Sequence, residues 1–284
     1  YGMGRMASGI EVPFEGGEYY ALKDVPHGDI RMKRYYSEVS RSWRRFFVYT
    51  PAGYDTRTDE KYPVLYLLHG GGEDERGWGT QGKTDLIMDN LIAAGKAKPM
   101  LVVMLDGNMP SAGFNAGALK AFEAELTQAV IPFVEDNYRV RKEADSRALA
   151  GLSMGGIQTL YAGLYHTDLF AHLGVFSSGW IPFYQKIADD QYEFINKNKA
   201  AIDSQLRLLW IAMGGKEDIA YQNCQNMLKE FDTLKLKYTY SEYPGGHTWP
   251  VWRNKYPLPT GPEATASGPV FSFKRDFDPT LLTV

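Results

Sequence analysis

The sequence predicts an α/β fold with a mainly parallel central sheet and helices on both of its faces. Short apolar runs of strand length alternate with segments of helical periodicity along most of the 284 residues. Two of the runs, 62–68 and 99–105, are almost continuously apolar, which is typical of strands buried on both faces of a parallel sheet. No internal repeat and no second domain boundary is visible.

The predicted elements follow in chain order. Residues 1–30 carry many glycines and prolines without clear periodicity, and we interpret them as an extended arm or linker that precedes one domain over 31–284. Residues 32–39 and 44–50 predict two antiparallel strands with a turn near Arg41 and Ser42. Further strands are predicted over 62–68, 99–105, 147–150, 171–176, 206–213 and 237–243.

Helices are predicted over 85–94, 122–133 and 219–234, with a fourth directly after Ser153. Pro132 is expected to break or kink the second helix near Ile131, because proline lacks the backbone N–H that a helix interior needs. The polar and aromatic segment 181–205 is interpreted as an insertion over the site.

Composition excludes some classes of function. The formal net charge of −3 gives no reason to expect nucleic acid or an anionic membrane as a partner, and no apolar run approaches the roughly 20 residues of a membrane span. Cys224 is the single cysteine, so an intrachain disulfide is excluded, and its helical spacing with Met227 and Leu228 favours a core thiol. The chain begins at Tyr1, which we interpret as a processed or trimmed start.

A predicted strand, a tight turn and a predicted helix meet at Gly151-Leu152-Ser153-Met154-Gly155. In this context Gly-x-Ser-x-Gly is typical of a nucleophile held exposed at the top of a sheet, and an ordinary glycine-rich turn is the alternative. Met154 would be the first residue of the following helix, and its N–H would point toward a developing oxyanion. A second donor is expected from the loop 69–72, because glycines after a buried strand let backbone N–H groups approach a ligand.

Asp218 and His247 are the two other catalytic candidates. Both follow predicted strands, and reactive groups of such sheets lie just past the carboxyl ends of strands. The order Ser153, Asp218, His247 is that of the α/β-hydrolase fold, in which histidine takes the serine proton and the carboxylate fixes the imidazole tautomer. The remaining histidines are interpreted as structural or solvated: His27, His69, His166 and His172. No cofactor is expected, since no metal-ligand spacing and no dinucleotide-binding glycine pattern occurs.

Together these motifs resemble carbohydrate esterase family 1, the feruloyl and acetylxylan esterases. The resemblance rests on His69-Gly70-Gly71-Gly72, Asp106-Gly107-Asn108, the Ser153 turn, Gly215-Lys216-Glu217-Asp218 and His247-Thr248-Trp249, and spans about residues 30–253. It implies a triad of Ser153, Asp218 and His247, with the backbone N–H groups of Met154 and Gly71 as oxyanion donors. The arm resembles a linker that follows a carbohydrate-binding module in gut-bacterial members, and an exported enzyme acting on plant xylan is implied. A Pro- and Gly-rich insertion at about 255–270 departs from the family pattern.

The resemblance implies hydrolysis of esters on plant cell-wall polysaccharide. Trp78, Trp180 and Trp249 lie near predicted strand ends and are candidate walls for a hydroxycinnamoyl ring, with Asn108 as a further substrate contact. Core packing and stacking on sugar are the alternatives for each tryptophan. We favour feruloyl over acetyl esters. A thioester hydrolase on the same fold and a catalytically inactive xylan-binding protein remain as alternatives.

Overall fold

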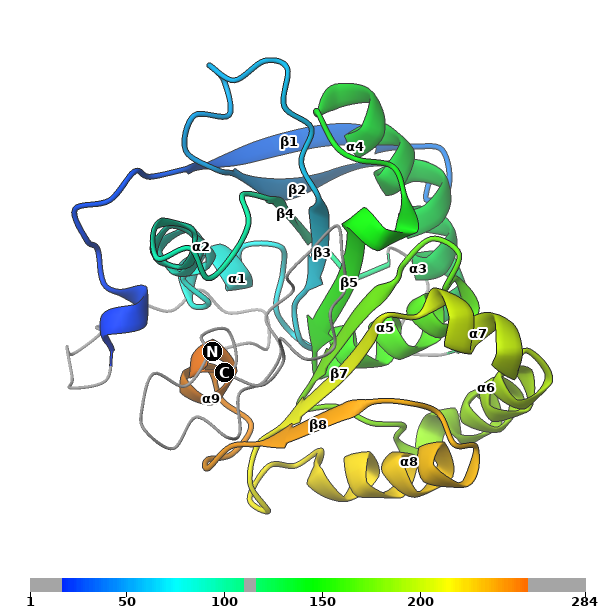
Figure 1. The fold of residues 1–284 in the computed structure, drawn as a ribbon. Coiled ribbons are helices and arrows are strands. Elements are labelled where there is room, and N and C mark those ends of the chain that lie inside the picture. Colours follow the sequence, from blue (N-terminus) through cyan, green and yellow to red (C-terminus); the bar gives the residue numbers. More distant parts are fainter. Residues whose placement is uncertain (1–16, 110–115, 255–284) are drawn as a thin grey trace.

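An eight-stranded sheet organises the protein, in the order β1-β2-β4-β3-β5-β6-β7-β8 (Figure 1). The structure is a computed structural model, and it describes residues 17–109 and 116–254. β2 pairs antiparallel with both β1 and β4, and the other neighbouring strands pair in parallel. The strands are β1 (Asp29–Ser37), β2 (Ser42–Thr50), β3 (Val64–Leu68), β4 (Leu101–Leu105), β5 (Arg147–Leu152), β6 (His172–Phe176), β7 (Leu208–Met213) and β8 (Thr239–Glu242).

Helices cover both faces of the sheet, which confirms the predicted fold class. The α-helices are α1 (Gly77–Thr80), α2 (Thr84–Ala93), α3 (Ala116–Ala124), α4 (Ile131–Asn137), α5 (Met154–Tyr165), α6 (Gln185–Lys197), α7 (Lys199–Gln205), α8 (Tyr221–Thr233) and α9 (Trp249–Asn254). Short helical turns of other types are η1 (Glu18–Tyr20), η2 (Glu125–Val130), η3 (Ala144–Ser146) and η4 (Pro182–Tyr184).

Two apolar clusters hold these layers together, one on each face. Successive strand residues point to opposite faces, so Tyr66 and Leu68 of β3 join the cluster under α3 to α8, whereas Leu65 and Leu67 join the cluster under α1, α2 and α9. Cys224 is buried in the first cluster, as its spacing predicted. The central strands are buried on both faces, and this is why they appear in the sequence as continuous apolar runs.

The helix does not break at Pro132, but it changes from π to α at Ile131, where a break or kink was predicted. The chain stays helical from Ala116 to Asn137, because a π-helical segment, η2, separates α3 from α4. The wider turn changes the hydrogen-bonding frame, so Pro132 falls in the first turn of α4, where its missing N–H costs nothing.

The interpretation of 181–205 as an insertion over the site is also wrong. This segment forms α6 and α7, and α6 packs on α5, where Gln191 donates to the carbonyl of Leu160 at 2.8 Å. At the end of α7, Gln205 accepts a hydrogen bond from Thr167, which precedes β6. These helices therefore extend the cover of one sheet face and lead back to the amino-terminal ends of the strands.

The described part of the arm lies beside α2. The Asn90 side chain donates to the carbonyls of Tyr19 and Ala21 at 2.9 and 3.0 Å, and Asp89 accepts from the His27 ring and from the Gly28 N–H. Residues 17–28 thus follow the domain surface up to β1. The remaining arm residues and the 255–270 insertion lie outside the described residues.

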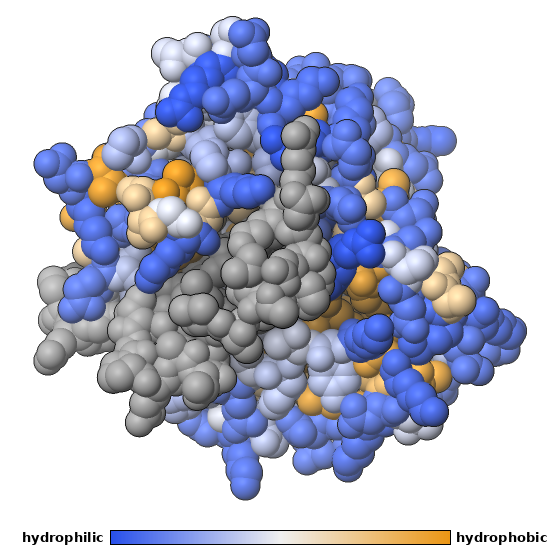
Figure 2. All heavy atoms as spheres, in the orientation of Figure 1, coloured by the Kyte–Doolittle hydropathy of each residue, from blue (hydrophilic) through white to orange (hydrophobic). Residues whose placement is uncertain are grey.

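The surface drawn in Figure 2 is predominantly hydrophilic, with apolar residues in separate patches. Among the described residues, no helix has both the length and the apolar character that a membrane span requires.

Candidate active site

The turn between β5 and α5 holds Ser153 in a strained conformation, with φ 53° and ψ −115°. A non-glycine residue at such a positive φ costs about 1–3 kcal/mol and persists only where the surroundings enforce it. Close backbone approach does so here: a Cβ at Gly151 would lie 2.4 Å from the carbonyl of Gly155, and a Cβ at Gly155 would lie 2.6 Å from the His69 oxygen. Any larger residue at these two glycines would therefore clash with the backbone. The turn that they allow places Ser153 at the carboxyl end of β5.

A continuous chain of hydrogen bonds links the three residues predicted for catalysis. The Nε2 atom of His247 lies 2.9 Å from the Ser153 Oγ, and its Nδ1 atom lies 2.8 Å from Asp218 Oδ1. An ionised carboxylate only accepts hydrogen bonds, so Nδ1 carries the ring proton and Nε2 is free to accept the serine proton. Ser153, Asp218 and His247 are far apart in sequence, and the ends of β5, β7 and β8 bring them together.

Asp218 is fully enclosed by protein, with a side chain of 0% exposure. It accepts hydrogen bonds from His247 and from the Ala220 N–H at 2.9 Å. Burial disfavours the charged carboxylate, but the hydrogen bonds from His247, Ala220 and Ser177 outweigh it and hold the pKa of Asp218 below its ordinary value. The carboxylate therefore stays ionised at neutral pH and orients the imidazole.

The loop 69–72 lies against the Ser153 turn. A Cβ built at Gly70 would lie 3.5 Å from the Ser153 Cβ, and one built at Gly71 would lie 3.9 Å from the Met154 Cβ. The Gly155 N–H donates to the His69 carbonyl at 3.1 Å and joins the two segments. Met154 is the first residue of α5, so its N–H has no acceptor within the helix. Backbone donors of both segments thus border the space in front of Ser153.

His69 supports this loop from within. Its ring is buried, and Nδ1 donates to the Gly70 carbonyl at 2.8 Å while Nε2 accepts the Gly107 N–H at 3.0 Å. The ring therefore connects the loops that follow β3 and β4. This agrees with the structural role expected for His69.

Sequence reasoning missed Glu73, which lies directly after the glycine run. Its Oε2 accepts the Gly70 N–H at 3.1 Å, and its Oε1 accepts the indole N–H of Trp249 at 2.7 Å. Its carbonyl accepts the side-chain amide of Asn108 at 2.9 Å. Glu73 thus bridges the glycine loop and Trp249. The signal in the sequence that could have indicated this bridge is a carboxylate directly after the glycine run.

The predicted substrate-binding tryptophans lie mostly inside the protein. Trp78 is 1% exposed and donates its indole N–H to the Leu68 carbonyl, so it packs beneath the loop, and the prediction of a substrate wall at this position is wrong. Trp180 and Trp249 are 6% and 7% exposed. Trp78 and Trp249 meet edge to face at 5.1 Å, which places Trp249 in the same packed layer. Asn108 is exposed, but its amide binds Glu73 and Asp106.

Trp252 meets the His247 ring edge to face at 4.9 Å. The three other histidines contact different parts of the chain. His27 is bonded to Asp89 and His166 to Glu123, while burial lowers the pKa of His172 to about 4. Within residues 17–109 and 116–254, no group of three or more His, Cys, Asp or Glu side chains is placed to hold a metal ion.

The sheet order, the serine turn and the hydrogen-bonded side chains define the class: an esterase of the α/β-hydrolase type. The family described as putative esterase matches residues 37–257, and the chain belongs to this family.

Individual relatives agree with this assignment. An endo-1,4-beta-xylanase/feruloyl esterase of Xylanibacter ruminicola is 41% identical over 188 residues, which is 63% of this chain and 26% of that protein. This chain thus spans about a quarter of the length of that relative.

Two solved structures superpose over most of their length. A CE1 ferulic acid esterase of Anaeromyces mucronatus in complex with ferulic acid has a TM-score of 0.70 at 26% identity, covering 83% of this chain and 91% of its own. A feruloyl esterase module of Clostridium thermocellum complexed with sinapinate has a TM-score of 0.70 at 26% identity, covering 88% and 92%. These matches confirm the resemblance to carbohydrate esterase family 1, while the preceding carbohydrate-binding module stays a prediction.

Proposed function

We propose that this protein hydrolyses feruloyl esters of plant xylan through an acyl-enzyme on Ser153. The observation that carries the proposal is the unbroken hydrogen-bond chain from Ser153 Oγ through His247 to Asp218. A serine hydroxyl is a weak nucleophile until a neighbouring base takes its proton, and this geometry supplies that base at 2.9 Å.

In the first half of the reaction, Ser153 Oγ attacks the ester carbonyl while His247 Nε2 accepts its proton. The imidazolium that forms is stabilised by Asp218, whose lowered pKa keeps it negative. The tetrahedral oxyanion binds the N–H groups of Met154 and Gly71, and each such donor lowers the barrier by about 3 kcal/mol. Collapse of this intermediate expels the sugar oxygen, which takes the proton from His247 and leaves as a hydroxyl group.

In the second half, water replaces the sugar. His247 removes a proton from the water, the resulting hydroxide attacks the acyl carbonyl, and the same N–H groups hold the second oxyanion. Collapse releases ferulate, and Ser153 Oγ regains its proton from His247. Asp218 stays ionised throughout.

The proposal that the acyl group is feruloyl rests on the descriptions of similar proteins. Feruloyl esterase, ferulic acid and sinapinate appear in the descriptions of the Xylanibacter relative and of the two superposable structures. Since xylan is a polymer outside the cell, we also propose that the enzyme is exported.

The test is product release from feruloylated arabinoxylan, acetylated xylan and a glutathione thioester, followed by chromatography. Ferulate as the main product supports the proposal, whereas acetate alone or faster thioester cleavage contradicts the acyl assignment. Ser153→Ala should lower ferulate release by at least about 10³-fold with unchanged circular dichroism. Ser204→Ala, an exposed serine of α7, is the matched control and should keep parent activity.

A further inference from the structure

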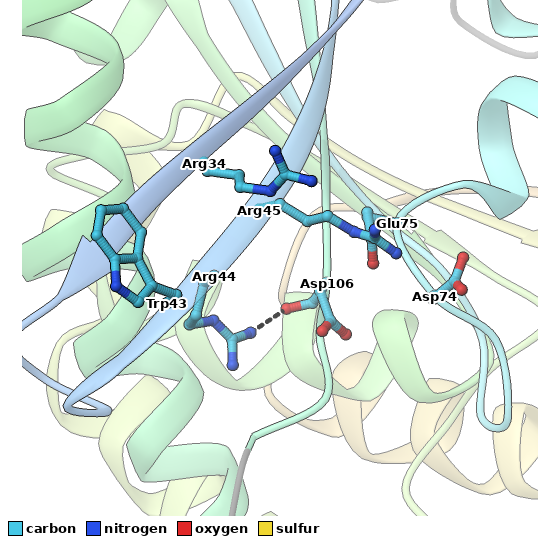
Figure 3. A pocket seen from close by; sticks show the side chains of 7 residues that line it. All are labelled: Arg34, Trp43, Arg44, Arg45, Asp74, Glu75 and Asp106. Atoms are coloured by element: carbon cyan, nitrogen blue, oxygen red, sulfur yellow. Dashed lines mark hydrogen bonds and ion pairs between the residues drawn. The ribbon is translucent and has the colours of Figure 1, made fainter.

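β2 extends beyond the carboxyl end of β4. The last paired residues are Phe46 of β2 and Leu105 of β4, so Ser42–Arg45 continue past the sheet edge and stand beside the loop that begins at Asp106. This is the edge at which β5 presents Ser153. A cavity of about 340 Å³ opens here, bounded by Arg34, Trp43, Arg44, Arg45, Asp74, Glu75 and Asp106 (Figure 3).

One face of the β1–β2 hairpin presents two cross-strand pairs to this region. Arg34 lies opposite Arg45, and Tyr36 lies opposite Trp43. Residues two apart on a strand share a face, so all four side chains lie on the same face. Trp43 is 72% exposed, and its ring meets that of Tyr36 edge to face at 5.8 Å.

Most charged side chains around the cavity have a partner, and the Asp106 carboxylate accepts hydrogen bonds from the backbone and side-chain N–H groups of Asn108. Arg45 pairs with Glu75, Arg76 pairs with Asp74, and Arg44 contacts Glu125 and donates to the Asp106 carbonyl at 2.6 Å. Arg34 is exposed, and no carboxylate of the described residues lies within ion-pairing distance of it. Like charges directly opposite on two strands repel, so an anion bound beside Arg34 would relieve this repulsion.

We propose that this hairpin face and its cavity form a sugar subsite for an oligosaccharide that carries a uronic acid, with Trp43 stacking on a sugar ring and Arg34 binding the uronate carboxylate. A guanidinium binds a carboxylate through two parallel hydrogen bonds, and an exposed indole offers a flat apolar face to the C–H groups of a pyranose. The inference rests on the proposed function, since it names the polysaccharide that carries the scissile ester.

The distance from Ser153 fits this role. β2, which carries Trp43, and β1, which carries Arg34, are three and four interstrand steps from β5 in the sheet, about 14 and about 19 Å, so the subsite lies a few sugar units from the reacting ester. The loop that bears Gly70 and Glu73 continues into Asp74 and Glu75 at the cavity, so one loop borders both the Ser153 turn and the subsite. A small ester such as methyl ferulate does not extend this far.

Binding is measured by calorimetry with unesterified xylo-oligosaccharides, either uronic-acid-bearing or neutral, so the result does not depend on activity. We expect the parent to bind the acidic oligosaccharide roughly three- to tenfold more tightly, with the difference reduced in 0.5 M salt. Arg34→Gln should abolish the difference, and Trp43→Ala should weaken both ligands. Lys186→Gln, which removes an exposed cation on α6, should change neither. Equal binding of the two oligosaccharides by the parent, or an unchanged difference in Arg34→Gln, overturns the proposal.

The same proteins are then assayed on methyl ferulate. All three variants should hydrolyse it at the parent rate, because the subsite lies beyond the ester. Loss of this activity in Arg34→Gln or Trp43→Ala contradicts a distal subsite. Absence of methyl ferulate hydrolysis in the parent contradicts the proposed function and leaves the binding result to decide the subsite.

Discussion

The carboxylate of Glu73 accepts the indole N–H of Trp249 at 2.7 Å, across 176 positions of sequence. Its other oxygen accepts the N–H of Gly70 in the loop beside Ser153, and Trp249 lies two residues after His247. One side chain therefore connects the loop proposed to hold the oxyanion with the segment that carries His247, the proposed base.

Replacing Glu73 with Gln should lower kcat about tenfold with little change in KM. The amide has one acceptor oxygen in place of two, so either Gly70 or Trp249 loses its acceptor, at a cost of about 1–3 kcal/mol. Steady-state kinetics on methyl ferulate across pH provide the check, and the profile should keep its shape because Ser153, His247 and Asp218 remain.

Trp249→Phe supplies the second arm of a double-mutant cycle. If Glu73 acts through Trp249, the double variant should lose less than the product of the two single effects. Asp59→Asn, which replaces an exposed carboxylate in the loop before β3, serves as the control and should be near neutral. Multiplicative losses would show that the contact between Glu73 and Trp249 has no part in the reaction.

Ser153→Gly should be more stable than Ser153→Ala by about 1 kcal/mol, because only glycine occupies φ 53° without strain. Both variants lack the hydroxyl, so both should be inactive and the comparison isolates the backbone. Urea unfolding followed by fluorescence gives the two free energies of unfolding. Equal values would mean that the turn carries no strain at this position.

Gly155→Ala should destabilise the protein by about 3 kcal/mol or more, since the new methyl group would lie 2.6 Å from the His69 oxygen, in backbone that cannot yield. Gly71→Ala is the matched comparison: its methyl group would lie 3.9 Å from Met154 Cβ, an ordinary contact. We expect Gly71→Ala to fold with near-parent stability. Thermal and urea unfolding of both variants distinguish a requirement for space from a general loss of loop flexibility.

Stability should fall between pH 7 and pH 5 in part through His172. Burial lowers its pKa to about 4, whereas the unfolded histidine titrates near 6.5, so the unfolded state binds more protons over this interval. The stabilising contribution is complete above the unfolded pKa and is lost as the pH falls toward 4. Between pH 7 and pH 5 the loss from this group amounts to about 2 kcal/mol.

His172→Gln removes this titration. The free energy of unfolding of the variant should depend less on pH between 7 and 5 than that of the parent. The difference between the two free energies at pH 8 is the reference for the lower pH values. Parallel pH dependences in parent and variant would show that His172 does not titrate as its burial requires.

Much of the site could be predicted because local patterns and chain order carry it. The glycines around Ser153 mark the turn, and the strands before Asp218 and His247 mark the sheet edge at which all three must meet. The segments that carry the other histidines argued against a catalytic role for them. In the structure His27 bonds Asp89, His166 bonds Glu123 and His69 supports the glycine loop.

The tryptophans show the limit of this reasoning. Position near a strand end does not say whether an indole faces solvent or the layer beneath, and Trp78 proved to lie in that layer. Pro132 shows a related limit: a break or kink near Ile131 was predicted, but not the π-helical segment that places Pro132 in the first turn of α4.

By itself, the sequence determined the fold class, the position of the serine turn and the identity of the three residues that the hydrogen-bond chain joins, because periodicity and glycine spacing are local properties of the chain. Only the tertiary structure decided that Glu73 connects the two loops of the site and that Arg34 and Trp43 share one face beside it. These relationships join segments distant in sequence, and they depend on strand register and loop contact, which no local pattern encodes.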